Sequence, residues 1–181
     1  MSLARRQCLL VLLLLGSSAA LTADDDLGDI WADFRSFAGK WSGTQSGVWG
    51  DGAGIRTFRF FINDSFLEQR TALRFDPQPA NPDGDTRLDY GVVSLDRRAR
   101  RFHFRRYYPG GLFVEYRLKE LDPAVGRFVW VSERVENALP NTTVEYIVMR
   151  EQPDRFTEKV VLLREGQEPR TVIDGSWERT P

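Results

Sequence analysis

The sequence predicts an all-β protein: a closed antiparallel up-and-down barrel of about ten strands, preceded by one short amphipathic helix. From Lys40 to Arg179 the apolar residues recur with a period close to two, which is the side-chain period of a strand. Turn residues interrupt this pattern at short intervals, and no crossover helix separates the runs, which indicates an antiparallel meander. Such a sheet loses its exposed edges by closing into a barrel. A two-sheet sandwich is the alternative.

The first 23 residues predict a signal peptide. Arg5 and Arg6 precede an apolar stretch over residues 8–15, and small residues follow it up to Ala23. A charged start, a short apolar core and a small-residue cleavage site are typical of secretory signals. The stretch is shorter than the roughly 20 residues that cross a bilayer, so we expect no transmembrane anchor. The alternative is a buried N-terminal helix.

Composition limits the function of the remaining domain, which we expect over residues 24–181 as one unit, secreted or periplasmic in a bacterium. The only cysteine, Cys8, lies before the cleavage site, so disulfides, thiol catalysis and cysteine-ligated metals are not expected in the mature chain. The formal net charge of −1 argues against a nucleic-acid partner. A hydrophobic content of 41% and an aromatic content of 12% support a substantial core.

The expected elements begin with the helix. Apolar residues recur at helical spacing after three aspartates, which suit a helix start, and the pattern ends at Gly39. These apolar residues are Leu27, Ile30, Trp31, Phe34 and Phe37. The expected strands then cover residues 40–49, 54–62, 66–75, 88–95, 100–108, 112–120, 127–134, 142–150, 155–164 and 170–179. The long connection over residues 76–86, with three prolines, is a candidate lid.

The run Gly39-Lys40-Trp41 after a helix resembles the calycin superfamily of lipocalins, fatty-acid-binding proteins and nitrobindins. In that superfamily an arginine on the last strand lies across the tryptophan ring and closes the barrel end, and Arg179 stands in the matching place. A guanidinium over an indole ring contributes roughly 0.5–2 kcal/mol. Nitrobindins hold haem through a histidine late in the chain, whereas the only histidine here, His103, lies mid-chain. We therefore expect no haem or other cofactor.

Three segments, over residues 66–70, 89–94 and 102–105, also resemble a bacterial lipocalin-like family of unestablished activity. That resemblance covers nearly the whole mature chain and implies a barrel fold more specifically than a function. Arg105 belongs to its pattern.

Alternation along each strand predicts the inward faces. The apolar set of the fifth strand includes Phe104, Arg106 and Tyr108, with Arg105 on the other face. The same test turns the following residues inward on other strands: Gln69, Thr71, Leu88, Tyr90, Val92, Ser94, Tyr116, Tyr146 and Trp177. This interior is mostly apolar with a few polar groups, as in ligand pockets. A barrel filled by its own side chains is the alternative.

Arg106 is the principal candidate for ligand binding, because a buried arginine requires an anionic partner. With Tyr108 it forms an Arg-x-Tyr pair, and fatty-acid-binding proteins use such a pair to bind a carboxylate. The alternative is a structural ion pair between Arg106 and Glu158, which lies between Phe156 and Val160 on an inward face.

These residues predict an exported protein that encloses a small amphiphilic ligand, with an anionic head group as one option. Arg106 would meet the head group, and Phe104, Tyr108, Tyr116 and Trp130 would contact the body. The remaining candidates for ligand contact are Gln69, Tyr90, Arg105 and Glu68.

Two other functions stay open. One is an isomerase or hydrolase that works in the same pocket through Glu68, Arg105 or His103. The other is an inhibitor or interaction module with exposed aromatic residues around Trp49 and Phe113. No catalytic residue or metal ligand is assigned, and the oligomeric state is left open.

Overall fold

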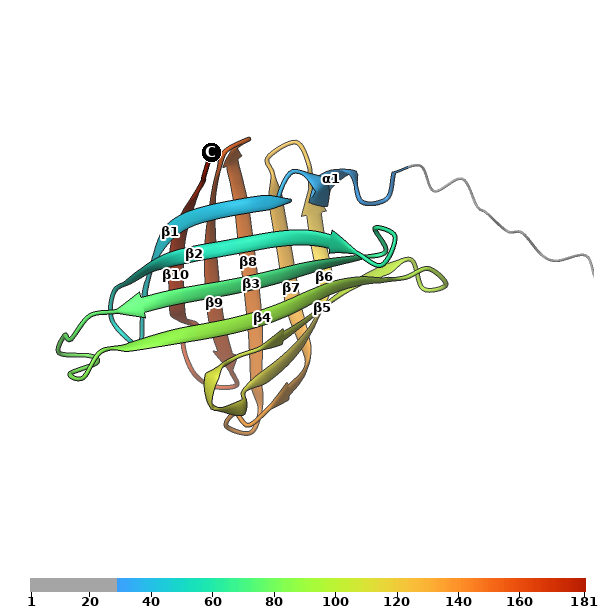
Figure 1. The fold of residues 1–181 in the computed structure, drawn as a ribbon. Coiled ribbons are helices and arrows are strands. Elements are labelled where there is room, and N and C mark those ends of the chain that lie inside the picture. Colours follow the sequence, from blue (N-terminus) through green and yellow to red (C-terminus); the bar gives the residue numbers. More distant parts are fainter. Residues whose placement is uncertain (1–28) are drawn as a thin grey trace, which may run out of the picture. The chain divides into compact units, whose positions relative to one another are not determined.

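Ten antiparallel strands form a closed barrel in the order β1-β10-β9-β8-β7-β6-β5-β4-β3-β2 (Figure 1). Each strand therefore pairs with its neighbours in sequence, and the first strand pairs with the last. The computed structural model describes residues 29–181, and the predicted signal peptide lies outside these residues. The closed up-and-down barrel with a short preceding helix confirms the predicted fold class and excludes the sandwich.

The described elements lie close to the residue ranges expected from the sequence. They are α1 (Ala32–Arg35), β1 (Gly39–Gly47), β2 (Gly52–Phe61), β3 (Phe66–Phe75), β4 (Asp85–Asp96), β5 (Arg101–Tyr107), the 3-10 turn η1 (Pro109–Gly111), β6 (Phe113–Asp122), β7 (Arg127–Glu136), β8 (Thr142–Gln152), β9 (Arg155–Arg164) and β10 (Arg170–Arg179). The helix is four residues long, and none of the described helices is long and apolar enough to span a bilayer.

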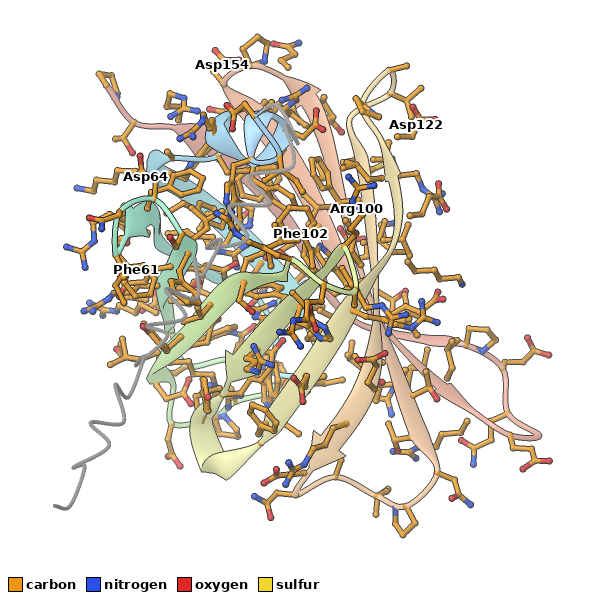
Figure 2. All side chains as sticks on the ribbon, turned by 90° about the vertical axis from the view of Figure 1, so that its right-hand side faces the viewer. Phe61, Asp64, Arg100, Phe102, Asp122 and Asp154 are labelled. Atoms are coloured by element: carbon orange, nitrogen blue, oxygen red, sulfur yellow. The ribbon has the colours of Figure 1, made fainter. Side chains whose placement is uncertain are left out.

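The helix closes one end of the barrel with aromatic side chains. Phe34 is buried, and its ring centroid lies 4.7 Å from that of Phe102 and 5.5 Å from that of Phe128. Trp31 packs edge-on against Phe102 at 5.0 Å. The turns near Asp64, Arg100, Asp122 and Asp154 surround this capped end (Figure 2).

The first and last strands are joined at the same end. Trp41 and Arg179 are register partners, and the guanidinium carbon lies 4.3 Å from the centroid of the Trp41 ring. Arg179 also donates hydrogen bonds to the backbone carbonyls of Ala38, at 2.7 Å, and Ser36. The Trp41 indole donates to the carbonyl of Phe37 at 2.8 Å. These contacts fasten the segment after α1 to both ends of the closed sheet.

The opposite end is formed by the β1–β2, β3–β4, β5–β6, β7–β8 and β9–β10 connections. The proline-containing β3–β4 connection is tied to the β1–β2 turn by two hydrogen bonds. The Asp51 amide donates to the Gln78 side chain at 2.7 Å, and Gln78 Nε2 donates to the Asp51 carbonyl at 2.8 Å. The candidate lid thus packs beside the β1–β2 turn.

Candidate functional site

A layer of buried charge crosses the barrel interior and separates two spaces. Along β9, Phe156 lines a space below the helix, Val160 lines a cavity at the opposite end, and Glu158 lies between them. Along β5 and the residue after it, Phe104 and Tyr108 stand in the same relation on either side of Arg106. Side chains two residues apart on a strand share a face. On the inward face of each of these strands, an aromatic residue is therefore followed by a charged residue and then by a residue that lines the large cavity.

Arg56 and Glu158 form the centre of this layer. Both side chains are 0% exposed, and Arg56 Nη1 and Nη2 donate to the two carboxylate oxygens at 2.6 and 2.8 Å. Glu158 also accepts hydrogen bonds from the Tyr146 hydroxyl at 2.7 Å and the Trp177 indole at 3.0 Å. Burial alone would raise the pKa of Glu158, but the charge and hydrogen bonds of Arg56 lower it to about 2. Glu158 is therefore a carboxylate at neutral pH.

Arg106 belongs to the same layer and pairs with Asp89, not with Glu158 as the structural alternative had it. Arg106 Nη2 donates to Asp89 Oδ1 at 3.1 Å, and the Arg106 side chain is 1% exposed. Its guanidinium carbon lies 4.6 Å from the centroid of the Tyr108 ring and 4.9 Å from that of Tyr146. Glu158 is already engaged by Arg56, so the carboxylate available to Arg106 comes from β4.

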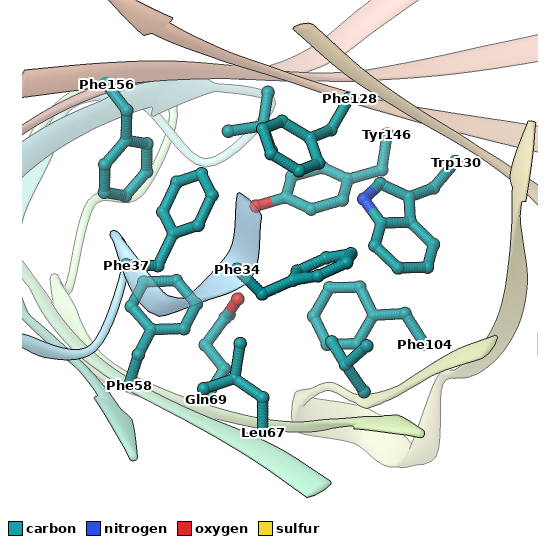
Figure 3. A pocket seen from close by; sticks show the side chains of 12 residues that line it. Phe34, Phe37, Phe58, Leu67, Gln69, Phe104, Phe128, Trp130, Tyr146 and Phe156 are labelled. Atoms are coloured by element: carbon teal, nitrogen blue, oxygen red, sulfur yellow. The ribbon is translucent and has the colours of Figure 1, made fainter. Parts of the chain in front are cut away.

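The space below the helix is small and aromatic, with a volume of about 30 Å³. Figure 3 shows its lining, with Phe34 of α1 at the centre and Gln69 directing its carbonyl oxygen inward. Gln69 Nε2 donates to Thr71 at 3.3 Å and to Asp89 at 3.2 Å, whereas Gln69 Oε1 is buried without a hydrogen-bond partner in the described structure. Phe104 and Trp130 also line this space. Its volume leaves room for water-sized molecules only.

The cavity at the opposite end is much larger, with a volume of about 540 Å³. Its lining is mainly aliphatic and includes Val114, Val144, Val160, Leu162 and Ile173. The Tyr108 and Tyr116 side chains also line it, and their hydroxyl oxygens lie 3.4 Å apart. Burial raises the pKa of both tyrosines, that of Tyr116 well above its ordinary value of 10, so both hydroxyls remain donors at neutral pH. Pockets of roughly 300–1,000 Å³ with mostly apolar walls and a few polar groups are typical of small-molecule sites.

Three of the expected ligand-contacting residues lie on the outer wall. Tyr90 was expected to face inward, but its ring packs outside the barrel against Tyr107 at 6.2 Å and under the Arg70 guanidinium at 5.6 Å. Glu68 accepts hydrogen bonds from Arg70 at 2.9 Å and Arg59 at 3.2 Å, both on exposed side chains. Arg105 pairs with Glu115 at 2.6 Å on the outer face of β5 and β6.

The inward face of β4 was assigned wrongly because apolar residues occupy both of its faces. Gly91 and Val93 are buried, whereas Leu88 is 65% exposed. Val92 and Ser94 share the outer face with Leu88. Asp89 shares the inner face with Gly91 and Val93, and its carboxylate pairs with Arg106. Because the inner face carries the charged Asp89, the alternation of polar and apolar residues did not identify it as the inner face.

The groups that an enzyme in this pocket would have used are not gathered in it. His103 lies on the outer side of β5, with Nδ1 3.6 Å from a carboxylate oxygen of Glu133, and it lines neither interior space. Glu68 and Arg105 lie on the outer wall as described above. Within residues 29–181 no group of three or more His, Cys, Asp or Glu side chains is placed to hold a metal ion.

The aromatic residues considered for an interaction surface have partners of their own. Trp49 lines the large cavity and lies under the Arg87 guanidinium at 4.3 Å. Phe113 packs against Tyr107 at 5.1 Å.

Arg56 and Asp89 are the two residues of the charged layer that sequence reasoning missed. Arg56 does alternate with the apolar Phe58, two residues on, and this spacing could have marked it as inward. Asp89 carried no such signal, because its neighbours two residues away are Arg87 and Gly91.

No protein-family model matches the sequence, and no curated protein matches it. The fold is similar to the crystal structure of Rv2717c from M. tuberculosis, with a TM-score of 0.62 and 12% sequence identity over 86% of this chain and 100% of that chain. A redesigned β-barrel matches with a TM-score of 0.42 and 14% identity over 81% of this chain and 94% of that chain. A structure of EF1p2_mFAP2b bound to DFHBI matches with a TM-score of 0.44 and 12% identity over 82% of this chain and 97% of that chain. The likeness to Rv2717c concerns the ten-stranded barrel fold.

Proposed function

We propose that this chain is an exported binding protein of the calycin type, which encloses a small amphiphilic molecule in the cavity at the end of the barrel opposite α1. The observation that carries this proposal is the cavity of about 540 Å³, which has mainly aliphatic walls and includes Tyr108 in its lining. The predicted signal peptide over residues 1–23 supports export.

The walls and the tyrosines have different roles in this proposal. Val114, Val144 and Val160 bury the apolar body of the ligand, at roughly 25 cal/mol per Å² of apolar surface removed from water. Tyr108 supplies a hydrogen bond to an oxygen or nitrogen acceptor on the ligand, and the fully buried Tyr116 stands behind it with its hydroxyl 3.4 Å from that of Tyr108. A hydrogen-bond donor in the cavity wall strengthens binding of a ligand that carries an acceptor, because a polar ligand atom buried without a partner would weaken binding.

Arg106 has an indirect role here. It does not line the cavity, and its guanidinium lies behind the Tyr108 ring while it pairs with Asp89. The positive charge next to the ring stabilises the position of Tyr108 and favours electron-rich groups at its hydroxyl. Phe104, Trp130 and Gln69 line the smaller space below the helix and not this cavity.

Native mass spectrometry of the mature protein, purified from its own host, tests the proposal. We expect a complex with a small molecule that dissociates under activation. The matched control is a Val160→Phe variant, which narrows the cavity and should retain less of the added mass. A wild-type protein that shows the unmodified chain mass alone, and binds no apolar dye added afterwards, would contradict the proposal.

A further inference from the structure

Two arginines stand at the mouth of the large cavity. Arg164 is the last residue of β9 and Arg170 the first residue of β10, and both side chains line the cavity. Arg170 is exposed and Arg164 is half-buried. The apolar side chains deeper in the cavity, such as Val160 and Ile173, belong to the same two strands. The mouth is therefore cationic and the interior apolar.

Neither of these arginines forms a salt bridge with a carboxylate in the described part of the chain. Arg164 donates from Nε to the Thr142 hydroxyl at 3.2 Å, which leaves its terminal nitrogens available. Across residues 29–181 neither Arg164 nor Arg170 forms a salt bridge, whereas Arg56 and Arg106 in the charged layer each have a carboxylate partner. In the described part of the chain, no aspartate or glutamate lines the cavity.

The two possible positions for an anionic head group, beside Arg106 and at the mouth of the cavity, differ in the free energy needed to remove water from the head group. At Arg106 the head group would have to lose its water and compete with Asp89 for a guanidinium that is already paired. At the mouth it would keep part of its hydration and meet two unpaired guanidinium groups, which bind carboxylates, sulfonates and phosphates through charge-assisted hydrogen bonds. The mouth is the favourable position.

We infer that the ligand of this cavity is an anionic amphiphile that binds with its apolar end inward and its acidic head group between Arg164 and Arg170. This inference rests on the proposed function and adds the charge and the orientation of the ligand. Tyr108 and the aliphatic side chains of the cavity then meet the part of the ligand farthest from the head group, which selects against a second charge at that end.

A pair of fluorescent dyes that differ by one charge tests the inference. Anilinonaphthalenesulfonate carries a sulfonate, and N-phenylnaphthylamine is the same ring system without it. In fluorescence titrations of the wild-type protein at low salt, we expect the sulfonate to bind about tenfold more tightly, which corresponds to one charge-assisted hydrogen bond or ion pair at a partly hydrated site. This preference should decline as salt is added, because the mouth is open to solvent.

An Arg164→Gln/Arg170→Gln double variant identifies the source of the preference. It should bind both dyes equally while its affinity for the uncharged dye stays as in the wild type. The matched control is Arg155→Gln, on the same strand at the capped end, which should keep the preference. A double variant that still prefers the sulfonate would overturn the inference.

The two proposals fail in different ways. Equal binding of both dyes by the wild-type protein would overturn the inference about the mouth and leave the binding function standing. If neither dye binds the wild-type protein, the proposed function fails and the inference fails with it.

Discussion

Arg56 and Glu158 come from strands β2 and β9 and meet in the middle of the barrel, where both side chains are fully buried and joined by two hydrogen bonds of 2.6 and 2.8 Å. A buried ion pair contributes little net stability compared with an apolar pair of similar volume, because both charges lose their hydration. Removing one partner has a larger effect, because the other charge then remains buried and unpaired.

Glu158→Gln should therefore destabilise the barrel strongly. We expect a loss of about 3–5 kcal/mol in the free energy of unfolding, because Arg56 would stay buried without its counter-charge. Equilibrium unfolding in urea measures this loss. The control is Glu151→Gln, which removes an exposed pair with Arg155 and should cost less than about 1 kcal/mol. Equal losses for the two variants would refute the role given to the buried pair.

The stability contributed by Glu158 should depend on pH in the acidic range. Arg56 lowers the pKa of Glu158 from 4.5 to about 2 in the folded protein, against the opposing effect of burial. A group with a depressed pKa stabilises the fold above its unfolded-state pKa and loses that contribution as the pH falls through its folded-state pKa. The difference in unfolding free energy between wild type and Glu158→Gln should thus shrink from about pH 4.5 to about pH 2. A constant difference across this range would contradict the assignment.

Arg179→Gln should loosen the capped end. The variant loses the contact with the Trp41 ring and the charged donors to the carbonyls of Ala38 and Ser36. We expect a loss of about 2 kcal/mol in the free energy of unfolding. Hydrogen exchange should accelerate over residues 31–38 before the rest of the barrel. Arg155→Gln, an exposed arginine at the same end, serves as the control, and a uniform acceleration across all strands would argue against a local closure.

Val160→Phe should narrow the large cavity and weaken ligand binding. The side chain at this position faces the cavity, so the added ring enters existing space and should change the free energy of unfolding by about 1 kcal/mol or less. Fluorescence titration with N-phenylnaphthylamine should give an affinity at least about tenfold weaker than that of the wild type. Val161→Phe places the same ring on the outer face and should leave binding intact. Unchanged binding by Val160→Phe would mean that the dye binds elsewhere.

The amino-acid sequence alone was enough to predict the barrel, its approximate strand boundaries and the helix at its start. The prediction was possible because most strands keep polar and apolar residues on opposite faces. Alternation with a period of two therefore indicates which face of a strand is turned toward the core. The contact between Trp41 and Arg179 was expected because these two residues resemble the tryptophan and arginine of the calycin pattern.

The tertiary structure alone decided which charges meet inside the barrel and where its space lies. On β4 both faces carry apolar residues, so alternation could not turn Tyr90 outward or Asp89 inward. The partners of Arg56 and Arg106 lie on other strands, and the barrel's closure and register bring them together. The volume of the cavity at the end opposite α1 likewise depends on how side chains from many strands pack together. A local pattern in the sequence cannot predict that volume.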